Sequence, residues 1–320
     1  MTTPTNKQLR EFILTSFNES EFDLFCFDYF EGVEHLFSDG MNIQTRVLEF
    51  IRYCQRQQRV DELLVALERE RPSTFPRAFP PSSPKQEPTS TSFIHEKTGL
   101  EFVYIPAGEF LFGENNFRIY LPEYWMCKTP VTFAAYQRFI QDNPEYAVPY
   151  VDEDWAEPFN WDPWWRSYPA AKADHPIVLV SWYDAVAFCK WANLHLTTEE
   201  QWEKAARGTD GRTYPWGNNE PTDKLCNFGK RVGSTTSVGS YSPQGDSPFC
   251  CVDMAGNVWE WCLNKFNDPK DITVDQSGDL RTLHGGSWDG NEAFVREMAR
   301  GFGVPEAIFN DGGFRVVYQL

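Results

Sequence analysis

The chain has 320 residues, 41% of them hydrophobic and 16% aromatic, and a formal net charge of -17 at pH 7. This apolar content is typical of a globular protein, and the length allows one large and one small domain. The negative charge excludes nucleic acid and anionic membranes as general partners, because both would be repelled.

The N-terminal residues and the cysteines together indicate a cytoplasmic protein. The first residues are polar and lack the apolar run of a signal peptide, and no run of about 18 apolar residues is present to cross a bilayer. The eight cysteines are scattered and include no C-x-x-C pair. We therefore expect reduced, buried thiols rather than a zinc site, and no membrane partner.

Residues 1–71 have the pattern of a small all-helical bundle. Asn18 and Glu21 have the spacing of a capping box, ahead of apolar residues at helical spacing. Two further apolar faces follow, one around Val47 and Phe50 and one around Leu63. The segment has too few histidines, cysteines or clustered carboxylates for catalysis, so we expect a packed domain with a charged surface.

This bundle resembles the effector-associated, death-like domains of bacteria. The resemblance rests on Leu9-Arg10-Glu11, on residues 17–22 (FNESEF), on residues 24–28 and on residues 47–71. Domains of this family are homotypic adaptors. The resemblance therefore implies that residues 1–71 recruit a partner that carries a like domain.

Residues 72–92 separate this bundle from the rest of the chain. Six prolines lie between Pro72 and Pro88, among serines and threonines. Such a stretch cannot bury enough apolar surface to fold, so it is expected to be an extended, semi-rigid linker. The second domain is expected to span residues 93–320.

The second domain shows short strands, a few helices and long loops. Residues 100–113 (LEFVYIPAGEFLFG) predict two strands around a turn at residues 106–108. Helices are expected over residues 132–141, 181–192 and 197–208, the last two with capping boxes that start at Ser181 and Thr197. More than fifty residues rich in Gly, Pro, Asn and Asp follow Gly208. The expected fold class is α+β with little regular structure.

Four tryptophans gather in an irregular stretch of the second domain, at positions 155, 161, 164 and 165. Aromatic rings of this kind can form a stacking platform for sugars. The alternative is that they fill the core, as large aromatic residues often do.

Several motifs of the second domain resemble the formylglycine-generating enzyme, or sulfatase-modifying factor, family. They are residues 176–185 (PIVLVSWYDA), 196–208 (LTTEEQWEKAARG), 214–218 (YPWGN), 253–261 (DMAGNVWEW), 285–288 (GGSW) and 313–315 (GFR). The resemblance implies a C-type-lectin-like fold and structural calcium. For the true enzymes it also implies copper-dependent oxidation of a substrate cysteine by two active-site cysteines.

The catalytic cysteines of that family have no counterpart in this sequence. The alignment puts Glu292 and Glu297 at the two cysteine positions, and no cysteine follows Cys262. Cu(I) requires soft thiolate ligands and the redox step requires sulfur, so carboxylates cannot replace them. We therefore expect no copper and no enzyme activity. The alternative is a formylglycine-generating-type oxidase that uses other residues.

The calcium part of the resemblance does have matching residues. Asp253, Gly256, Val258 and Glu260 match the second calcium site of the family, with two carboxylates and two carbonyl oxygens for a hard cation. Chelation is then expected to lower the melting temperature. The alternative is that both acids are solvated or pair with arginine. A further family site would begin at Asn227 and Phe228, in a loop that lacks the expected acid.

The segment 283–317 resembles the variable region of a branch of this family that is rewritten by diversity-generating retroelements. These systems mutate adenines, so a randomised AAC codon yields fifteen residue types but never Glu, Gln, Lys, Met or Trp. The expected ligand-binding surface is made of residues that, apart from the first, all fall in the permitted set: Trp288, Asp289, Gly290, Asn291, Ala293, Phe294, Gly301, Phe302, Gly303, Val304, Ala307, Ile308, Phe309, Asn310 and Asp311.

The sequence therefore predicts a non-catalytic ligand-binding protein. Phe294, Phe302, Ile308 and Phe309 are the expected apolar anchors, and Asp289, Asn310 and Asp311 form the polar rim. The ligand is expected to be a protein or another macromolecule. The glycine-rich ends, together with Arg296 and Arg300, are the expected frame. The alternative is that the aromatic residues are buried and the loop is simply long.

Overall fold

A computed structural model describes residues 4–30, 32–38, 40–57, 59–71, 74–78 and 91–318 of the chain. The chain divides into two compact units, Met1–Thr89 and Ser90–Leu320, and each is described by itself. Among the described residues, no helix is both long enough and apolar enough to span a membrane.

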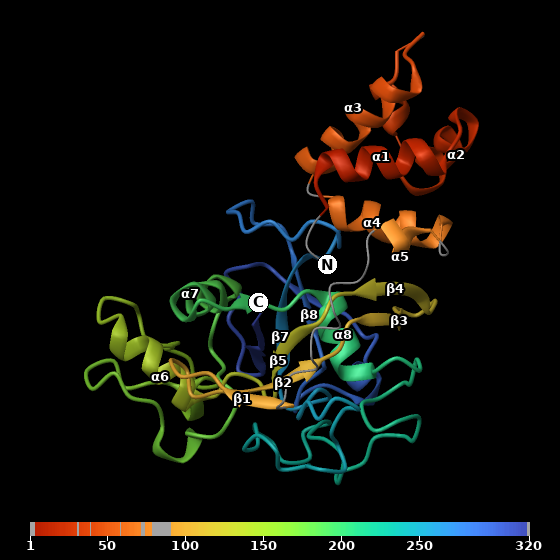
Figure 1. Cartoon of the computed structure of the whole chain (residues 1–320). Helices are drawn as coiled ribbons and strands as arrows, with labels where there is room; N and C mark the ends of the chain where they lie inside the picture. Colours follow the sequence, from red (N-terminus) through yellow and green to blue (C-terminus); the bar gives the residue numbers. More distant parts are fainter. Residues whose placement is uncertain are drawn as a thin grey trace. The chain divides into compact units, whose positions relative to one another are not determined.

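The first unit is a helical bundle (Figure 1), as its sequence pattern predicts. Its core joins residues from all of the helices, with Phe22, Phe50 and Leu67 fully buried. Asn18 caps its helix in a reciprocal capping box with Glu21. The elements are α1 (Asn6–Ser16), α2 (Glu19–Tyr29), η1 (Val33–Leu36), α3 (Ile43–Arg56), α4 (Val60–Glu70) and α5 (Phe75–Ala78).

The expected linker is shorter than residues 72–92. Its beginning forms the helical turn α5, and the Phe75 ring is completely buried against Phe12 in the core of the bundle. Its end, from Ser92, is already part of a strand. The buried Phe75 ring supplies an apolar contact with the bundle, which the proline-rich composition of this stretch did not predict. Residues 72–73 and 79–90 lie outside the described part of the chain.

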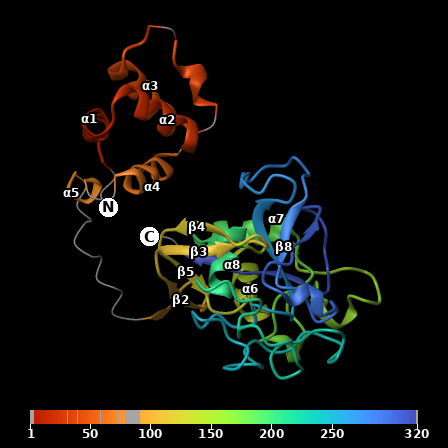
Figure 2. The ribbon, with the colours of Figure 1, turned by 90° about the vertical axis from the view of Figure 1, so that its right-hand side faces the viewer.

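The second unit combines short strands with helices and long loops (Figures 1 and 2). Its strands are β1 (Ser92–Ile94), β2 (Glu101–Ile105), β3 (Gly108–Phe112), β4 (Phe117–Leu121), β5 (Tyr124–Cys127), β6 (His195–Leu196), β7 (Trp259–Lys265), β8 (Arg281–His284), β9 (Gly301–Gly303), β10 (Gly312–Phe314) and β11 (Val316–Tyr318). Its helices are α6 (Phe133–Asp142), η2 (Glu157–Phe159), η3 (Ala170–Lys172), α7 (Trp182–Ala192), α8 (Glu199–Arg207) and η4 (Glu292–Val295).

Three sheets organise these strands. One has the order β1-β2-β5-β11-β6, so strands from the beginning and the end of the unit pair with each other. A second has the order β10-β7-β8-β9, with β10 parallel to β7. The hairpin β3-β4 forms the third. The two strands expected in residues 100–113 are present, but β2 and β3 belong to different sheets and do not pair with each other.

The helices of this unit begin at side-chain caps. Thr132 and Ser181 cap α6 and α7 as expected. The third cap is displaced by one residue: Thr198, not Thr197, accepts from Gln201, and the buried Thr197 Oγ1 lies against Cys262 Sγ instead. Between Gly208 and Trp259 the chain forms loops and turns, as its Gly and Pro content predicts.

Candidate functional site

The two ends of segment 283–317 are anchored by glycines at which a side chain would clash or strain the backbone. Gly285 and Gly286 both have positive φ, and a Cβ on Gly286 would lie 2.6 Å from the Phe294 carbonyl oxygen. A Cβ on Gly313 would lie 2.5 Å from the carbonyl oxygen of Ile177. The segment therefore leaves β8 and enters β10 at points fixed by close backbone packing.

Arg315, between β10 and β11, is the centre of a buried polar cluster. Its Nη2 and Nε donate to the Glu260 carboxylate at 2.9 and 3.0 Å, and both side chains are almost fully buried. Its Nη1 donates to the carbonyl oxygens of Cys127 and Lys128 and its Nη2 to that of Val252. The guanidinium thus ties the end of the segment to β5, to β7 and to the loop before β7.

This arrangement does not fit a calcium ion bound by Glu260. One carboxylate oxygen accepts from Nη2 and Nε of Arg315, and the other accepts from Nε and from Trp202 Nε1 at 2.7 Å. Three N–H groups thus donate to this carboxylate, with the Nε–H of Arg315 shared between its two oxygens, and the guanidinium charge beside it disfavours a second cation. The structure contains the arginine pair that was the alternative for Glu260. With this pair in place, we expect chelation to leave the melting temperature unchanged.

The other residues assigned to calcium have different local environments. Asp253 is buried and accepts from Gly239 N, and burial raises its pKa to about 6. Gly256 O accepts from Val258 N at 2.9 Å. Asn227 Oδ1 is buried and has no hydrogen-bond partner among the described residues. No group of three or more His, Cys, Asp or Glu in the described chain could hold a metal.

Six of the fifteen residues expected to form the ligand-binding surface are exposed. Phe294 is 44% exposed, Phe302 57% and Ile308 37%, although each is a large apolar side chain. Val304, Asn291 and Ala293 are exposed beside them in the sequence, and Asp289, Gly290 and Asn310 are half-buried. We call the exposed set, Asn291, Ala293, Phe294, Phe302, Val304 and Ile308, the display set.

The rest of the expected surface packs inward. Trp288 is buried, with Nε1 donating to Asn310 O, and the Asp311 carboxylate accepts from Ser287 Oγ at 2.6 Å. Phe309 lies on Trp261 with ring centroids 5.9 Å apart. Gly303 is buried, and a Cβ there would lie 2.7 Å from the Trp261 ring. We therefore expect these positions, and the half-buried Ala307 and Gly301, to tolerate fewer residue types than the codon pattern permits.

Residues outside the segment support the display set. Trp259 meets the Phe294 ring edge to face at 5.7 Å, and Phe266 packs on Phe302 at 4.7 Å. Lys230 forms an ion pair of 2.7 Å with Asp289, and its backbone N–H donates to Trp288 O. Sequence reasoning missed Lys230 and Phe266, because nothing in their local pattern marks them and only the fold brings them here.

The expected frame arginines differ in role. Arg300 pairs with the buried Glu199 at 2.8 Å, and its guanidinium lies over the Phe266 ring. Arg300 therefore secures the backbone just before β9. Arg296 is exposed and forms no ion pair among the described residues, so it is not part of the frame.

The connection between β7 and β8, which projects from the sheet in Figure 2, is held by one lysine. Lys265 Nζ lies 2.8, 2.8 and 2.9 Å from the carboxylates of Asp271, Asp275 and Asp279. The intervening Ile272 and Val274 are exposed. The hydrogen bond from Lys265 lowers the pKa of Asp271 to about 2. This stabilisation is present above the ordinary pKa of about 4 and is lost as the pH falls toward about 2.

We expect Lys265→Met to release this connection while leaving the rest of the domain folded. Three carboxylates then repel one another, and Ile272 and Val274 become easier to cleave. Limited digestion with thermolysin, which cleaves before large apolar residues, should cut the variant faster within residues 266–280. Lys270→Met is the control, since Lys270 makes no ion pair among the described residues. Equal cleavage of all three proteins would contradict the expectation.

The two positions expected to match the catalytic cysteines of the family have opposite environments. Glu292 lies exposed at the start of η4. Glu297 is buried, and neither of its carboxylate oxygens has a hydrogen-bond partner among the described residues. Burial, with a contribution from the nearby Glu203, raises the pKa of Glu297 well above its usual range. Of the two acids expected at the cysteine positions, one is therefore exposed and the other is buried without a partner among the described residues.

The cysteines follow the expectation of buried thiols with one exception. All eight are free, and seven are buried, whereas Cys250 is exposed. Burial raises the pKa of Cys127 and Cys251 to about 12, so these thiols stay protonated at neutral pH.

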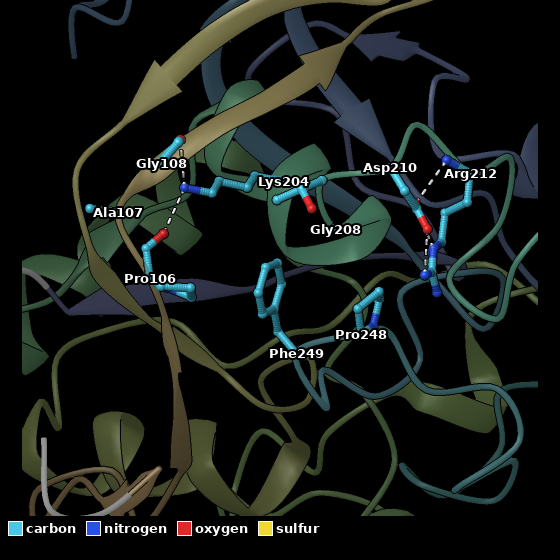
Figure 3. A pocket seen from close by; sticks show the side chains of 10 residues that line it. Pro106, Ala107, Gly108, Lys204, Gly208, Asp210, Arg212, Pro248 and Phe249 are labelled. Atoms are coloured by element: carbon cyan, nitrogen blue, oxygen red, sulfur yellow. Dashed lines mark hydrogen bonds and ion pairs between the residues drawn. The ribbon is translucent and has the colours of Figure 1, made fainter. Parts of the chain in front are cut away.

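A pocket of about 300 Å³ lies at the end of α8, between the β2–β3 turn and the loop at Pro248 and Phe249 (Figure 3). Lys204 Nζ donates to the carbonyl oxygens of Pro106 and Gly108, and Arg212 forms a two-point contact with Asp210. Burial lowers the pKa of Lys204 to about 8. These charged groups already have partners from the same chain, so they hold the fold together.

Curated relatives cover much of the second unit. Hercynine oxygenase from Mycobacterium tuberculosis is 31% identical over 62% of this chain and 53% of that protein. The formylglycine-generating enzyme of Streptomyces coelicolor is 36% identical over 47% of this chain and 57% of that protein. The inactive Cα-formylglycine-generating enzyme 2 of Bos taurus is 36% identical over 45% and 50%. The chain thus spans between half and two thirds of the length of these relatives.

Solved structures share the fold. PvdO from Pseudomonas aeruginosa matches with a TM-score of 0.59 and 21% identity, over 72% of this chain and 98% of that one. Treponema denticola variable protein 1 matches with a TM-score of 0.54 and 22% identity, over 72% and 99%. At this identity the likeness shows the fold alone, an α+β domain of the C-type-lectin-like, formylglycine-generating-enzyme type.

Two family models account for the two units of the chain. Residues 9–72 match the model of Effector-associated domain 7, in agreement with the helical bundle and with the resemblance seen in its sequence. Residues 89–320 match the model described as Sulfatase-modifying factor enzyme 1-like domain. Because the second match covers more than half of the chain, the protein belongs to the sulfatase-modifying factor enzyme 1-like family.

Proposed function

We propose that this protein is a non-catalytic ligand-binding protein of a diversity-generating retroelement, in which the display set binds a macromolecular ligand. One observation carries the proposal. Phe294, Phe302 and Ile308 are exposed on a segment whose two ends are held by buried glycines and by Arg315. Apolar side chains on a rigid frame bind with little loss of conformational entropy.

The absence of the enzyme's sulfur supports binding rather than oxidation. Glu292 and Glu297 take the two cysteine positions, and no cysteine follows Cys262 in the sequence. Relatives named as formylglycine-generating enzymes and a relative named as inactive both lie in the family. A lost active site on an intact fold is consistent with the second kind.

We also propose that the helical unit is an adaptor that recruits a partner with a like domain. The match to Effector-associated domain 7 supports this role. On α2, Leu24 and Phe27 are 59% and 68% exposed, although both are large and apolar. Exposed apolar side chains on a small, well-packed bundle are suited to a protein contact.

The DNA that flanks the gene tests the retroelement directly. We expect a reverse-transcriptase gene and a near-identical repeat of the sequence that encodes residues 283–317, with differences at the adenines of the template. If neither is present, the diversification part of the proposal is wrong, whereas binding by the display set can still be measured.

Substitutions separate the display set from the packed positions. Serine at Asn291, Ala293 or Val304 should change the free energy of unfolding by no more than about 0.5 kcal/mol, because these side chains are exposed. Gly303→Val should cost about 1–3 kcal/mol, because its Cβ meets Trp261 at 2.7 Å. Denaturant unfolding measures both. Comparable losses at all four positions would show that the segment has no tolerant surface.

A further inference from the structure

Two tryptophans outside segment 283–317 are almost fully exposed. Trp164 is 90% exposed and Trp165 is 83%, whereas Trp161 of the same stretch is buried against Phe133 and Tyr168. The alternative that these tryptophans fill the core therefore holds for Trp161 but not for Trp164 or Trp165. Adjacent indole rings left in water are unusual unless they contact another molecule.

Hydrogen bonds of Asp162 and Arg166 hold the turn that carries these rings. Asp162 Oδ1 accepts from the backbone N–H groups of both Trp164 and Trp165 at 2.8 Å, and Asp162 pairs with Ser167 in a short bridge. Arg166 has φ of 50° and its Nη2 donates to the carbonyl oxygens of Ile140, Asn143 and Tyr146 at the end of α6. The two rings are thus presented on a fixed backbone.

The segment beside the turn supplies the charge that a partner would meet. Asp152, Glu153, Asp154, Glu157 and Asp162 are exposed, and none forms an ion pair with a cationic side chain in the described chain. Exposed carboxylates without cationic partners, close in sequence to the two exposed indole rings, favour a ligand with positive charge. Arg and Lys side chains also stack over tryptophan rings better than over other aromatic rings.

We propose that Trp164 and Trp165 form a second binding site, which takes an arginine- or lysine-rich segment of a partner protein. The rings supply cation–π contacts, and the carboxylates of residues 152–162 supply long-range attraction. Anionic membranes are disfavoured by the same carboxylates. The site is independent of the display set and of any role in a retroelement.

Binding of a fluorescently labelled nona-arginine peptide to the full chain tests this site by fluorescence anisotropy. Trp164→Ala with Trp165→Ala leaves the net charge unchanged, so it separates the rings from general attraction to a protein of charge -17. We expect this variant to bind at least ten-fold more weakly with an unchanged melting temperature. Trp164→Phe with Trp165→Phe should keep most of the affinity.

A control variant and a variant with fewer carboxylates complete the experiment. Leu24→Ala with Phe27→Ala removes exposed apolar area from the helical unit and should leave peptide binding unchanged. Asp152→Asn, Asp154→Asn and Glu157→Gln together should weaken binding and reduce its dependence on salt. Equal affinity of the wild type and the double alanine variant would overturn the proposal. So would ring-dependent binding of a β-glucan or of phosphatidylcholine vesicles without ring-dependent binding of the peptide.

Discussion

Glu260→Ala is expected to destabilise the second unit by about 3–5 kcal/mol, the usual cost of leaving a buried charge without its partner. Arg315 remains surrounded by the carbonyl oxygens of Cys127, Lys128 and Val252, which cannot neutralise it. Trp202 Nε1 also loses its acceptor. Denaturant unfolding of the full chain, followed by tryptophan fluorescence, gives the change in free energy.

A matched control separates burial from pairing as such. Glu101 accepts from Lys128 Nζ at 3.0 Å, close to the Arg315–Glu260 distance, but both side chains are about one third exposed. Glu101→Ala should therefore cost no more than about 1 kcal/mol. If excess EDTA lowered the melting temperature of the wild type to that of Glu260→Ala, Glu260 would be a calcium ligand and the arginine pair would not explain its role.

Glu297→Met is expected to stabilise the protein at pH 8 by about 1–3 kcal/mol, the cost of an unpaired buried polar group that the substitution removes. Neither carboxylate oxygen of Glu297 has a hydrogen-bond partner among the described residues, and the side chain is buried. Methionine has a similar length and is apolar, so it fills the same space without a charge. Thermal unfolding of the two proteins at pH 8 measures the gain.

The gain should fade as the pH falls, and the direction follows from the raised pKa of Glu297. The folded protein binds this proton more tightly than the unfolded chain does. The contribution of Glu297 to wild-type stability therefore decreases as the pH rises above the unfolded pKa, about 4.3 for glutamate, and is recovered on acidification. Glu292→Gln, at the other cysteine position but exposed, should change little at either pH. A Glu297→Met variant that is less stable than wild type at pH 8 would show that this carboxylate has a partner.

Local patterns in the sequence were enough to predict most helices and the fold class. The capping boxes at Asn18 and Ser181 need only residues three positions apart, so they were predicted at the right residues. At Thr197 and Thr198 both residues suit a cap, and the choice followed from Thr197 packing against Cys262, which lies far away in the sequence. Likewise β2 and β3 were expected from their composition, but their partner strands depend on the whole sheet.

The candidate ligand-binding surface was also predicted only in part from the sequence. The codon pattern identified which residue types could vary, but it could not distinguish Phe302, which is exposed, from Phe309, which lies on Trp261. It also could not show that Gly303 has no room for a side chain. Both distinctions depend on contacts with β7, more than forty residues earlier in the chain.

The sequence by itself determined the family, the division into two domains and the absence of cysteine after Cys262. Each of these depends only on which residues are present and in what order. The tertiary structure decided the partner of Glu260, the limits of the display set and the exposure of Trp164 and Trp165. Each of these depends on whether a side chain is buried and on which distant groups share its space. Neither composition nor spacing along the chain determines that.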